Sequence, residues 1–199
     1  VGPAGRIAPV TSMRRSLPHD ISNALAASAL ALESGLAEPR HIATALSTFV
    51  HPAHRIEPVA TINGVAWFND SKATTPHAAI TALRGFRRVV LLAGGLNKGL
   101  DLSGLTTEHE RVKAVVGLGT SAGDVTAAFA PYCHTEVASS MASAVDVAAR
   151  LAEPGDVVLL SPACASFDWY PDGGYPARGD DFKRLVTALI PSSAEQESA

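Results

Sequence analysis

The 199-residue sequence has little of several features that mark common protein classes. Its two cysteines, Cys133 and Cys164, are too few for a disulfide framework and indicate a reducing, cytoplasmic setting. No CxxC, HExxH or similar spacing occurs, so no zinc site is expected. No apolar run is long enough for a membrane span, and the first residues do not resemble a signal peptide. The formal net charge is −3 and no run of Lys and Arg occurs, so neither a nucleic-acid partner nor a membrane partner is expected.

What the sequence does have is a regular alternation of short apolar segments and helical segments, with 47% hydrophobic residues to form a core. Strands are predicted at residues 56–62, 65–68, 88–93, 112–116, 132–137 and 157–161. Helices are predicted at residues 76–85, 121–130, 140–151 and 180–190. Asn63-Gly64 predicts a type I′ turn between the first two strands. The pattern predicts an α/β fold, a mostly parallel sheet of about six strands with helices on both faces.

The first fifty residues do not fit that alternation. A strand is predicted around residues 6–10, then a helix over 17–34 that ends at Gly35, and a second helix over 39–49. Both helices are rich in apolar residues and lack a sheet to cover. We therefore expect residues 1–50 to be the incomplete end of a preceding domain, residues 51–191 to form a domain, and residues 192–199 to be a disordered tail.

Three segments with candidate chemistry follow predicted strands: Asp70–Thr75, Gly94–Gly99 and Ser161–Asp168. The first offers a carboxylate, a cation and three hydroxyls just before a helix, which suits a phosphate or a small zwitterion. Its simpler interpretation is that Asp70 and Thr75 only cap the turn. The glycines of the second segment can bring backbone N–H groups close to an anion. Because parallel strands end at one edge of a sheet, we expect the three segments to converge there.

The same segments resemble the Mur ligase superfamily, and within it the branch that adds D-glutamate. The resemblance covers residues 17–189. It is carried by short stretches that match the family's motifs: His54-Arg55-Ile56-Glu57, Asn69-Asp70-Ser71-Lys72-Ala73-Thr74, Gly94-Gly95-Leu96-Asn97-Lys98-Gly99, Ser161-Pro162-Ala163-Cys164-Ala165-Ser166, and a Pro18–Ala27 stretch like the end of the family's central ATPase domain. The resemblance implies a Rossmann-like fold preceded by a helical remnant of that central domain.

The resemblance also implies roles for individual residues. Lys98 and Lys72 are the implied catalytic cations. The implied D-glutamate contacts are Lys98, Thr74, Ser166, the backbone of Phe167, and Tyr175. The implied nucleotide contacts are Asn23, Asp20, Arg55, Asp70 and Lys72. The sequence departs from the family pattern with Asp20 in place of Asn, Asn97 in place of a frequent Asp, and a loop at 172–176 about two residues longer. Asn23 can instead form a hydrogen bond with a backbone group of its helix. Arg55 can instead form an interdomain salt bridge with a carboxylate.

The implied function is that of an ATP-dependent ligase in peptidoglycan biosynthesis. D-Glutamate is joined to UDP-N-acetylmuramoyl-L-alanine through an acyl phosphate, with Mg²⁺ assisting. GxxxxGK(S/T) does not occur in this sequence. The phosphate-binding loop and the metal ligands are therefore expected in the remainder of the central domain, and the isolated chain is expected to be inactive.

Four alternatives remain open. The chain can belong to a ligase of the same superfamily with another amino-acid acceptor, or to a non-catalytic ligand-binding module of the same fold. Gly117–Gly123, with Glu136 after it, approaches the spacing of a dinucleotide fingerprint and so favours a nicotinamide cofactor, although it does not open the first βα unit. Cys164 is a candidate nucleophile, but no His lies in a predicted pairing position.

Overall fold

The computed structural model describes residues 5–190 and divides into two compact units, Val1–His51 and Pro52–Ala199. We treat each unit by itself. The predicted disordered tail lies outside the described residues. The assignment of residues 1–50 to an incomplete preceding domain and of residues 51–191 to a second domain stays a prediction.

The N-terminal unit consists of two α-helices preceded by a short 3-10 helix. The 3-10 helix is η1 (Val10–Ser12), and the α-helices are α1 (Pro18–Glu33) and α2 (Pro39–Thr48). The predicted strand at residues 6–10 is wrong, because residues 6–9 have no regular structure and Pro9 cannot donate a ladder hydrogen bond. Leu25, Leu30 and Leu36 are exposed, so the apolar helices bury little of their own surface within this unit.

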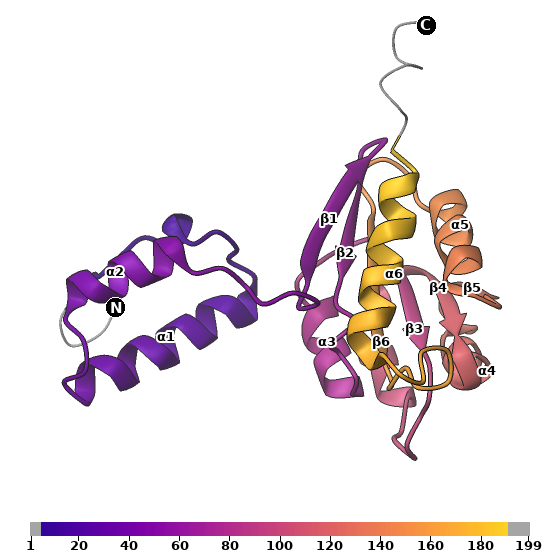
Figure 1. The fold of residues 1–199 in the computed structure, drawn as a ribbon, viewed down its shortest axis with the longest axis horizontal. Coiled ribbons are helices and arrows are strands. Elements are labelled where there is room, and N and C mark those ends of the chain that lie inside the picture. Colours follow the sequence, from indigo (N-terminus) through magenta and orange to yellow (C-terminus); the bar gives the residue numbers. More distant parts are fainter. Residues whose placement is uncertain (1–4, 191–199) are drawn as a thin grey trace, which may run out of the picture. The chain divides into compact units, whose positions relative to one another are not determined.

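The C-terminal unit contains a six-stranded sheet, which confirms the predicted fold class. The strands are β1 (Glu57–Ile62), β2 (Val65–Asn69), β3 (Val89–Gly94), β4 (Val112–Leu118), β5 (His134–Val137) and β6 (Val157–Ala163). Their order across the sheet is β1-β2-β6-β3-β4-β5 (Figure 1). Only β1 is antiparallel to its neighbour; the other four pairings are parallel.

Helices cover both faces of this sheet. The helices are α3 (Pro76–Leu83), η2 (Ser103–Arg111), η3 (Gly119–Ser121), α4 (Ala122–Phe129), α5 (Met141–Leu151) and α6 (Gly174–Ala188). Helices α5 and α6 contact each other and one face of the sheet, while α3, η2 and α4 pack together on the other (Figure 1). Among the described residues no helix combines the length and apolar character needed to cross a membrane.

Helix α6 begins six residues before its predicted start at Asp180. Gly173 and Gly174 predict a loop, and Pro176 predicts a break. The structure places Pro176 in the first turn of α6, where a helix needs no N–H donor. The earlier start brings Tyr175 and Arg178 onto a helix instead of a loop, and it fixes both relative to the sheet.

The core follows from the alternation of side chains along the strands. Val90, Leu92 and Leu160 lie in one cluster with Ala144 of α5 and Phe182 of α6. All five are fully buried. The intervening residues of each strand point to the opposite face, where α3 and α4 pack. Burial on both faces explains why these strands are nearly continuous apolar runs.

The turn at Asn63-Gly64 has positive φ at both residues, 51° and 77°, as a type I′ turn requires. A Cβ added at Gly64 would also lie 3.1 Å from Pro154 Cβ. We expect Gly64→Ala to lower the free energy of unfolding by about 1–2 kcal/mol, measured by urea denaturation. Gly104→Ala is the matched control, because a Cβ there meets no atom within 4 Å. Equal stability of the two variants would contradict the strain at Gly64.

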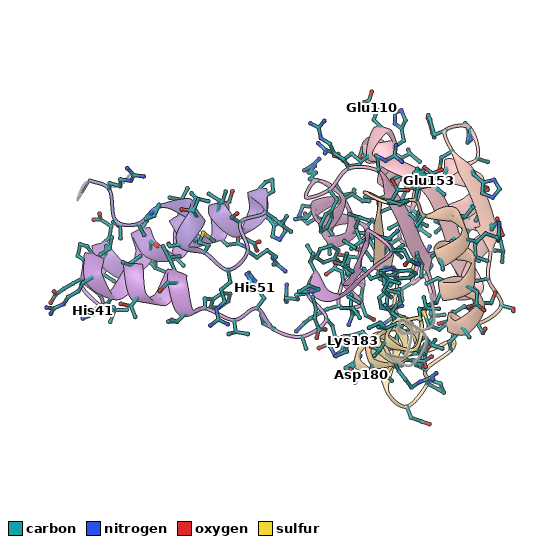
Figure 2. The ribbon with its side chains drawn as sticks, turned by 90° about the horizontal axis from the view of Figure 1, so that it is seen from above. His41, His51, Glu110, Glu153, Asp180 and Lys183 are labelled. Atoms are coloured by element: carbon teal, nitrogen blue, oxygen red, sulfur yellow. The ribbon has the colours of Figure 1, made fainter. Side chains whose placement is uncertain are left out.

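The amino end of the sheet carries a compact charge cluster around Asp156. This carboxylate is 1% exposed. It accepts hydrogen bonds from Arg88 Nε at 2.6 Å, Lys113 Nζ at 2.6 Å and the Glu153 backbone N–H at 2.8 Å. Glu153, labelled in Figure 2, pairs with both cations at the surface. The cluster ties the starts of β3, β4 and β6 together.

Candidate functional site

The three predicted site segments leave the sheet at its carboxyl edge. Strands β2, β6 and β3 are adjacent and parallel, so their carboxyl ends lie side by side. Asp70 follows β2, Gly95 follows β3, and the third segment contains the end of β6. Leu96 N–H donates to Ala165 O at 2.9 Å, which joins the second segment to the third. The segments therefore converge as expected from the topology.

A cavity of about 260 Å³ opens beside these segments. Four of the residues with implied acceptor roles line it: Thr74, Ser166, Phe167 and Tyr175. The rest of its wall comes from Ala165, Pro176 and the segment from Asp172 to Gly174. The segment 172–176, which includes the first residues of α6, thus forms one wall of the cavity.

Two lysines flank this cavity. Lys72 Nζ lies 5.4 Å from the ring centroid of Tyr175, and Lys98 Nζ lies 5.8 Å from that of Phe167. Both separations allow a cation–π attraction, which orients the ammonium groups relative to the cavity wall. Lys72 is half-buried, whereas Lys98 is exposed. Neither lysine lines the cavity itself; each contacts an aromatic residue of its wall, and Asp172 adds a carboxylate-bearing residue to the lining.

Ser166 has a hydroxyl with no hydrogen-bond partner within residues 5–190. The side chain is only 2% exposed, and the residue lines the cavity. A buried hydroxyl without a partner costs stability, so its presence calls for a reason. A bound polar group in the cavity supplies one, since the hydroxyl can then donate a hydrogen bond.

The Asp70 carboxylate has a clear local role. Its Oδ1 accepts from the Ile56 N–H at 3.1 Å, and its Oδ2 accepts from the Ser161 hydroxyl at 2.8 Å. It thus holds the start of β1 and the end of β6 to the end of β2. Thr75 caps α3, accepting from Ala78 N–H at 3.4 Å. The capping interpretation therefore describes Thr75 well, while the implied ribose contact of Asp70 stays a prediction.

The glycines of the second segment are required by packing. A Cβ on Gly94 would collide with Leu118 O, and one on Gly95 with Ala165 O. Gly95 O also accepts hydrogen bonds from the Ser121 hydroxyl at 2.6 Å and its N–H at 3.1 Å. The pair thus permits close contact with the neighbouring loops, a different reason from the anion approach that the sequence indicates. Beyond them, Asn97 forms two 2.9 Å hydrogen bonds with the backbone of Leu100, which closes the loop that carries Lys98.

Sequence reasoning missed Arg178 of α6. This arginine is 2% exposed, and its guanidinium donates to backbone carbonyls and to the Ser71 hydroxyl at the base of the site. Burial lowers the pKa of Arg178 to about 10, although the charge of Asp168 opposes that change. No motif of the sequence analysis includes Arg178, and its contacts with Ser71 and Cys164 depend on the folded chain.

The structure also bears on two alternatives. Burial raises the pKa of the Cys164 thiol, the opposite of what a nucleophilic thiolate needs. At the glycine-rich turn after β4, the Thr120 N–H donates to Asp168 Oδ2 at 2.9 Å and the Ser121 N–H donates to Gly95 O at 3.1 Å. Two amides that a dinucleotide phosphate requires are thus already engaged, which disfavours a nicotinamide cofactor.

The residues implied in nucleotide binding are divided between the two units. Asp20 and Asn23 belong to α1 of the N-terminal unit, while Arg55 and Lys72 belong to the C-terminal unit. Asp20 is buried, and Arg15 donates to both of its oxygens at 2.7 Å. Burial raises the pKa of Asp20, but the Arg15 hydrogen bonds and charge outweigh it and leave the pKa below its usual value. Asn23 and Arg55 are exposed. Nucleotide contact by any of these residues stays a prediction.

A second polar network joins α6 to the strands behind the site. Asn69 Nδ2 lies 3.0 Å from His54 Nδ1 and 3.1 Å from Glu57 Oε2. Lys183 bridges Glu57 at 3.3 Å and Asp180 at 3.1 Å, and Figure 2 shows Asp180 and Lys183 beside each other on α6. This network holds the first half of α6 against β1 and β2, and with it the segment 172–176.

Comparison with known proteins gives consistent results. Residues 54–164 match the family model described as Mur ligase, glutamate ligase domain. The chain is 47% identical over 188 residues to UDP-N-acetylmuramoylalanine–D-glutamate ligase from Frankia casuarinae, covering 92% of this chain and 39% of that protein. It is 43% identical to the enzyme of the same name from Shewanella violacea, covering 91% and 40%. The chain thus spans about two fifths of the length of these relatives.

The fold has a counterpart among solved structures. The UDP-N-acetylmuramate–alanine ligase of Thermotoga maritima superimposes with a TM-score of 0.64 at 14% identity, covering 88% of this chain and 39% of that one. At that identity the likeness concerns the fold alone.

Proposed function

The chain belongs to the Mur ligase family, and from that premise we propose that it forms the acceptor-binding part of an ATP-dependent ligase that adds D-glutamate to UDP-N-acetylmuramoyl-L-alanine. Two relatives more than 40% identical carry that activity in their names. The proposal assigns the protein to peptidoglycan biosynthesis in the cytoplasm. It assigns residues 1–50 to the end of a central ATPase domain.

The observation that carries the proposal is the unpartnered Ser166 hydroxyl in a cavity flanked by Lys72 and Lys98. D-Glutamate has two carboxylates and one amine. The two ammonium groups beside the aromatic walls suit the carboxylates, and a buried hydroxyl adds a directed hydrogen bond. The charge arrangement thus supports an acceptor with excess negative charge, as the names of the relatives indicate.

In this proposal the chain contributes mainly positioning. Lys98, Ser166 and the Phe167 backbone hold the acceptor carboxylates, and Thr74 with Tyr175 limits the rest of the cavity. Holding the acceptor amine at a fixed place converts a bimolecular attack into an effectively unimolecular one. ATP supplies the phosphoryl group that activates the alanyl carboxylate. Arg55, Asp70 and Lys72 lie where the proposal places the nucleotide, with Asp20 and Asn23 as adenine contacts from the N-terminal unit.

The described residues offer no site for the magnesium ion that the resemblance implies. Within residues 5–190, no three His, Cys, Asp or Glu side chains gather as they would around a metal ion. The residues present therefore do not fit a magnesium site, and we derive no step through the metal. The proposal places its ligands in another part of the ligase.

Binding of D-glutamate to the chain is the direct test. Titration followed by NMR should shift the amides of residues 165–167 and 98, and L-glutamate should shift them less. Equal or stronger binding of another amino acid would favour the alternative of a Mur ligase with a different acceptor. A coupled ATP-hydrolysis assay should show no substrate-dependent turnover by the chain alone. A parent gene without GxxxxGK(S/T) upstream would favour the non-catalytic binding module.

Ser166→Ala separates binding from stability. Because the hydroxyl has no partner within the described residues, its removal should leave the melting temperature unchanged or slightly higher. We expect D-glutamate affinity to fall about tenfold, since a hydrogen bond to a carboxylate is lost.

Ser161→Ala is the matched control for Ser166→Ala. Ser161 is also buried, but its hydroxyl donates to Asp70. Its replacement should lower the melting temperature. A loss of stability in Ser166→Ala, with unchanged affinity, would contradict the role of Ser166 in the cavity.

A further inference from the structure

Arg178 is a buried cation without a carboxylate partner. Its side chain is 2% exposed, and among residues 5–190 its guanidinium forms no ion pair, only hydrogen bonds to neutral groups. Burying an unpaired charge costs several kcal/mol or more in the absence of compensation. A leucine or methionine would fill the same space without that cost, so packing alone does not account for an arginine here.

The hydrogen bonds of Arg178 go to two of the three site segments. In the first segment, Nε donates to Ser71 Oγ at 2.9 Å and Nη2 to Ser71 O at 2.8 Å. In the third, Nη2 donates to Cys164 O at 3.1 Å and Nη1 to Ala165 O at 3.3 Å. The planar guanidinium of Arg178, a residue of α6, thus bridges the end of β2 and the end of β6.

Two of these acceptors, Ala165 O and the Ser71 hydroxyl, extend the connection further. Ala165 O also accepts from the Leu96 N–H at 2.9 Å, which brings in the second segment. The Ser71 hydroxyl in turn donates to Tyr175 O at 2.8 Å, which brings in the cavity wall formed by 172–176. One side chain therefore lies at the centre of a network that joins every segment lining the cavity.

We propose that Arg178 is the positioning residue of the acceptor site: it holds together the three segments that carry Lys72, Lys98 and Ser166. The inference rests on the proposed function for the identity of the ligand, but not for the loop-holding role. Arg178 does not line the cavity and acts through Ser71, Cys164 and Ala165.

Hydrogen exchange tests the loop-holding role without any ligand. In Arg178→Lys, which keeps a positive charge but not the planar fork, we expect the amides of Ser71, Lys72 and Leu96 to exchange about tenfold faster. Amides of the central strand β3 should be unchanged. Ser71→Ala is a milder second variant that removes only the link from Arg178 to Tyr175. A uniform rise across the C-terminal unit, or no rise at these three amides, would overturn the proposal.

Acceptor binding provides the second readout. D-Glutamate affinity should fall about tenfold in Arg178→Lys and by a smaller factor in Ser71→Ala. The matched control is Arg184→Gln, which removes an arginine of the same helix whose side chain is 69% exposed and pairs with Asp181. Its affinity and exchange should equal those of the unmodified chain.

The two readouts separate the two proposals. Faster exchange in the three segments with unchanged D-glutamate affinity would reject Arg178 as a positioning residue. Absence of D-glutamate binding by the unmodified chain would reject the proposed function, and the exchange data alone would then decide whether Arg178 holds the segments.

Discussion

Replacing Lys98 with alanine should weaken D-glutamate binding by about ten- to a hundredfold, the largest functional effect that we expect from a single substitution in this chain. Lys98 is exposed and is oriented over the ring of Phe167, 5.8 Å from its centroid. Its ammonium is therefore available to a carboxylate in the adjacent cavity. A charge-assisted hydrogen bond of this kind is stronger than a neutral one.

Isothermal titration of D-glutamate, or NMR titration where binding is weak, measures the effect. The melting temperature should stay the same, because no hydrogen bond of the Lys98 side chain within the described residues is lost. Arg87→Ala is the control for net charge, since Arg87 is exposed just before β3, at the opposite end of the sheet. Equal affinities of Lys98→Ala and Arg87→Ala would count against Lys98 as the acceptor cation.

Replacing Asp156 with asparagine should lower the free energy of unfolding by about 2–4 kcal/mol, and the melting temperature by roughly 10 °C. The substitution keeps the shape but removes the charge that accepts hydrogen bonds from Arg88 and Lys113. Both cations can still reach water, so the loss stays below that of stranding a fully buried cation. Asp146→Asn is the control, because Asp146 is exposed on α5.

The Asp156 effect should also depend on pH. Burial raises the pKa of this carboxyl, but the hydrogen bonds from Lys113, the Glu153 N–H and Arg88 outweigh it, so the pKa is below the usual 3.8. A lowered pKa in the folded state means that the stabilisation is complete above the unfolded-state pKa and is lost as pH falls through the folded-state value. The difference in urea midpoint between the unmodified chain and Asp156→Asn should be full near pH 7 and shrink below pH 4 or so. A pH-independent difference would contradict this.

The sheet could be predicted from the sequence because its strands carry unambiguous local signals. Continuous apolar runs such as Val89–Ala93 fit only strands buried on both faces, and Asn63-Gly64 fits only a tight hairpin turn. Once the strands are parallel, their carboxyl ends share an edge, so the convergence of the three segments follows from topology. The strand predicted at residues 6–10 failed because β-forming residues without a partner strand do not make a sheet.

Other features depend on contacts between distant residues and carry no local signal. The role of Arg178 comes largely from its contacts with Ser71, which lies 107 residues away in sequence. Gly95 is required because Ala165 O lies where its Cβ would be, and no pattern around Gly95 reports that. The start of α6 was misplaced for a related reason: a proline has opposite meanings in the first turn of a helix and in its interior.

The two ends of the sheet use charge in contrasting ways. At the amino end, Asp156 satisfies two cations, whereas at the carboxyl end Arg178, Lys72 and Lys98 are grouped without an ion-paired carboxylate in the part of the chain that the structure describes. Strands of this length keep the two ends roughly 20 Å apart, beyond the screening length of physiological salt. Substitutions at the carboxyl end can therefore change acceptor preference, and substitutions at the amino end can change the melting temperature, with little effect on each other. Burial of the Arg178 guanidinium remains a cost to stability at the carboxyl end, which nearby negative charge reduces.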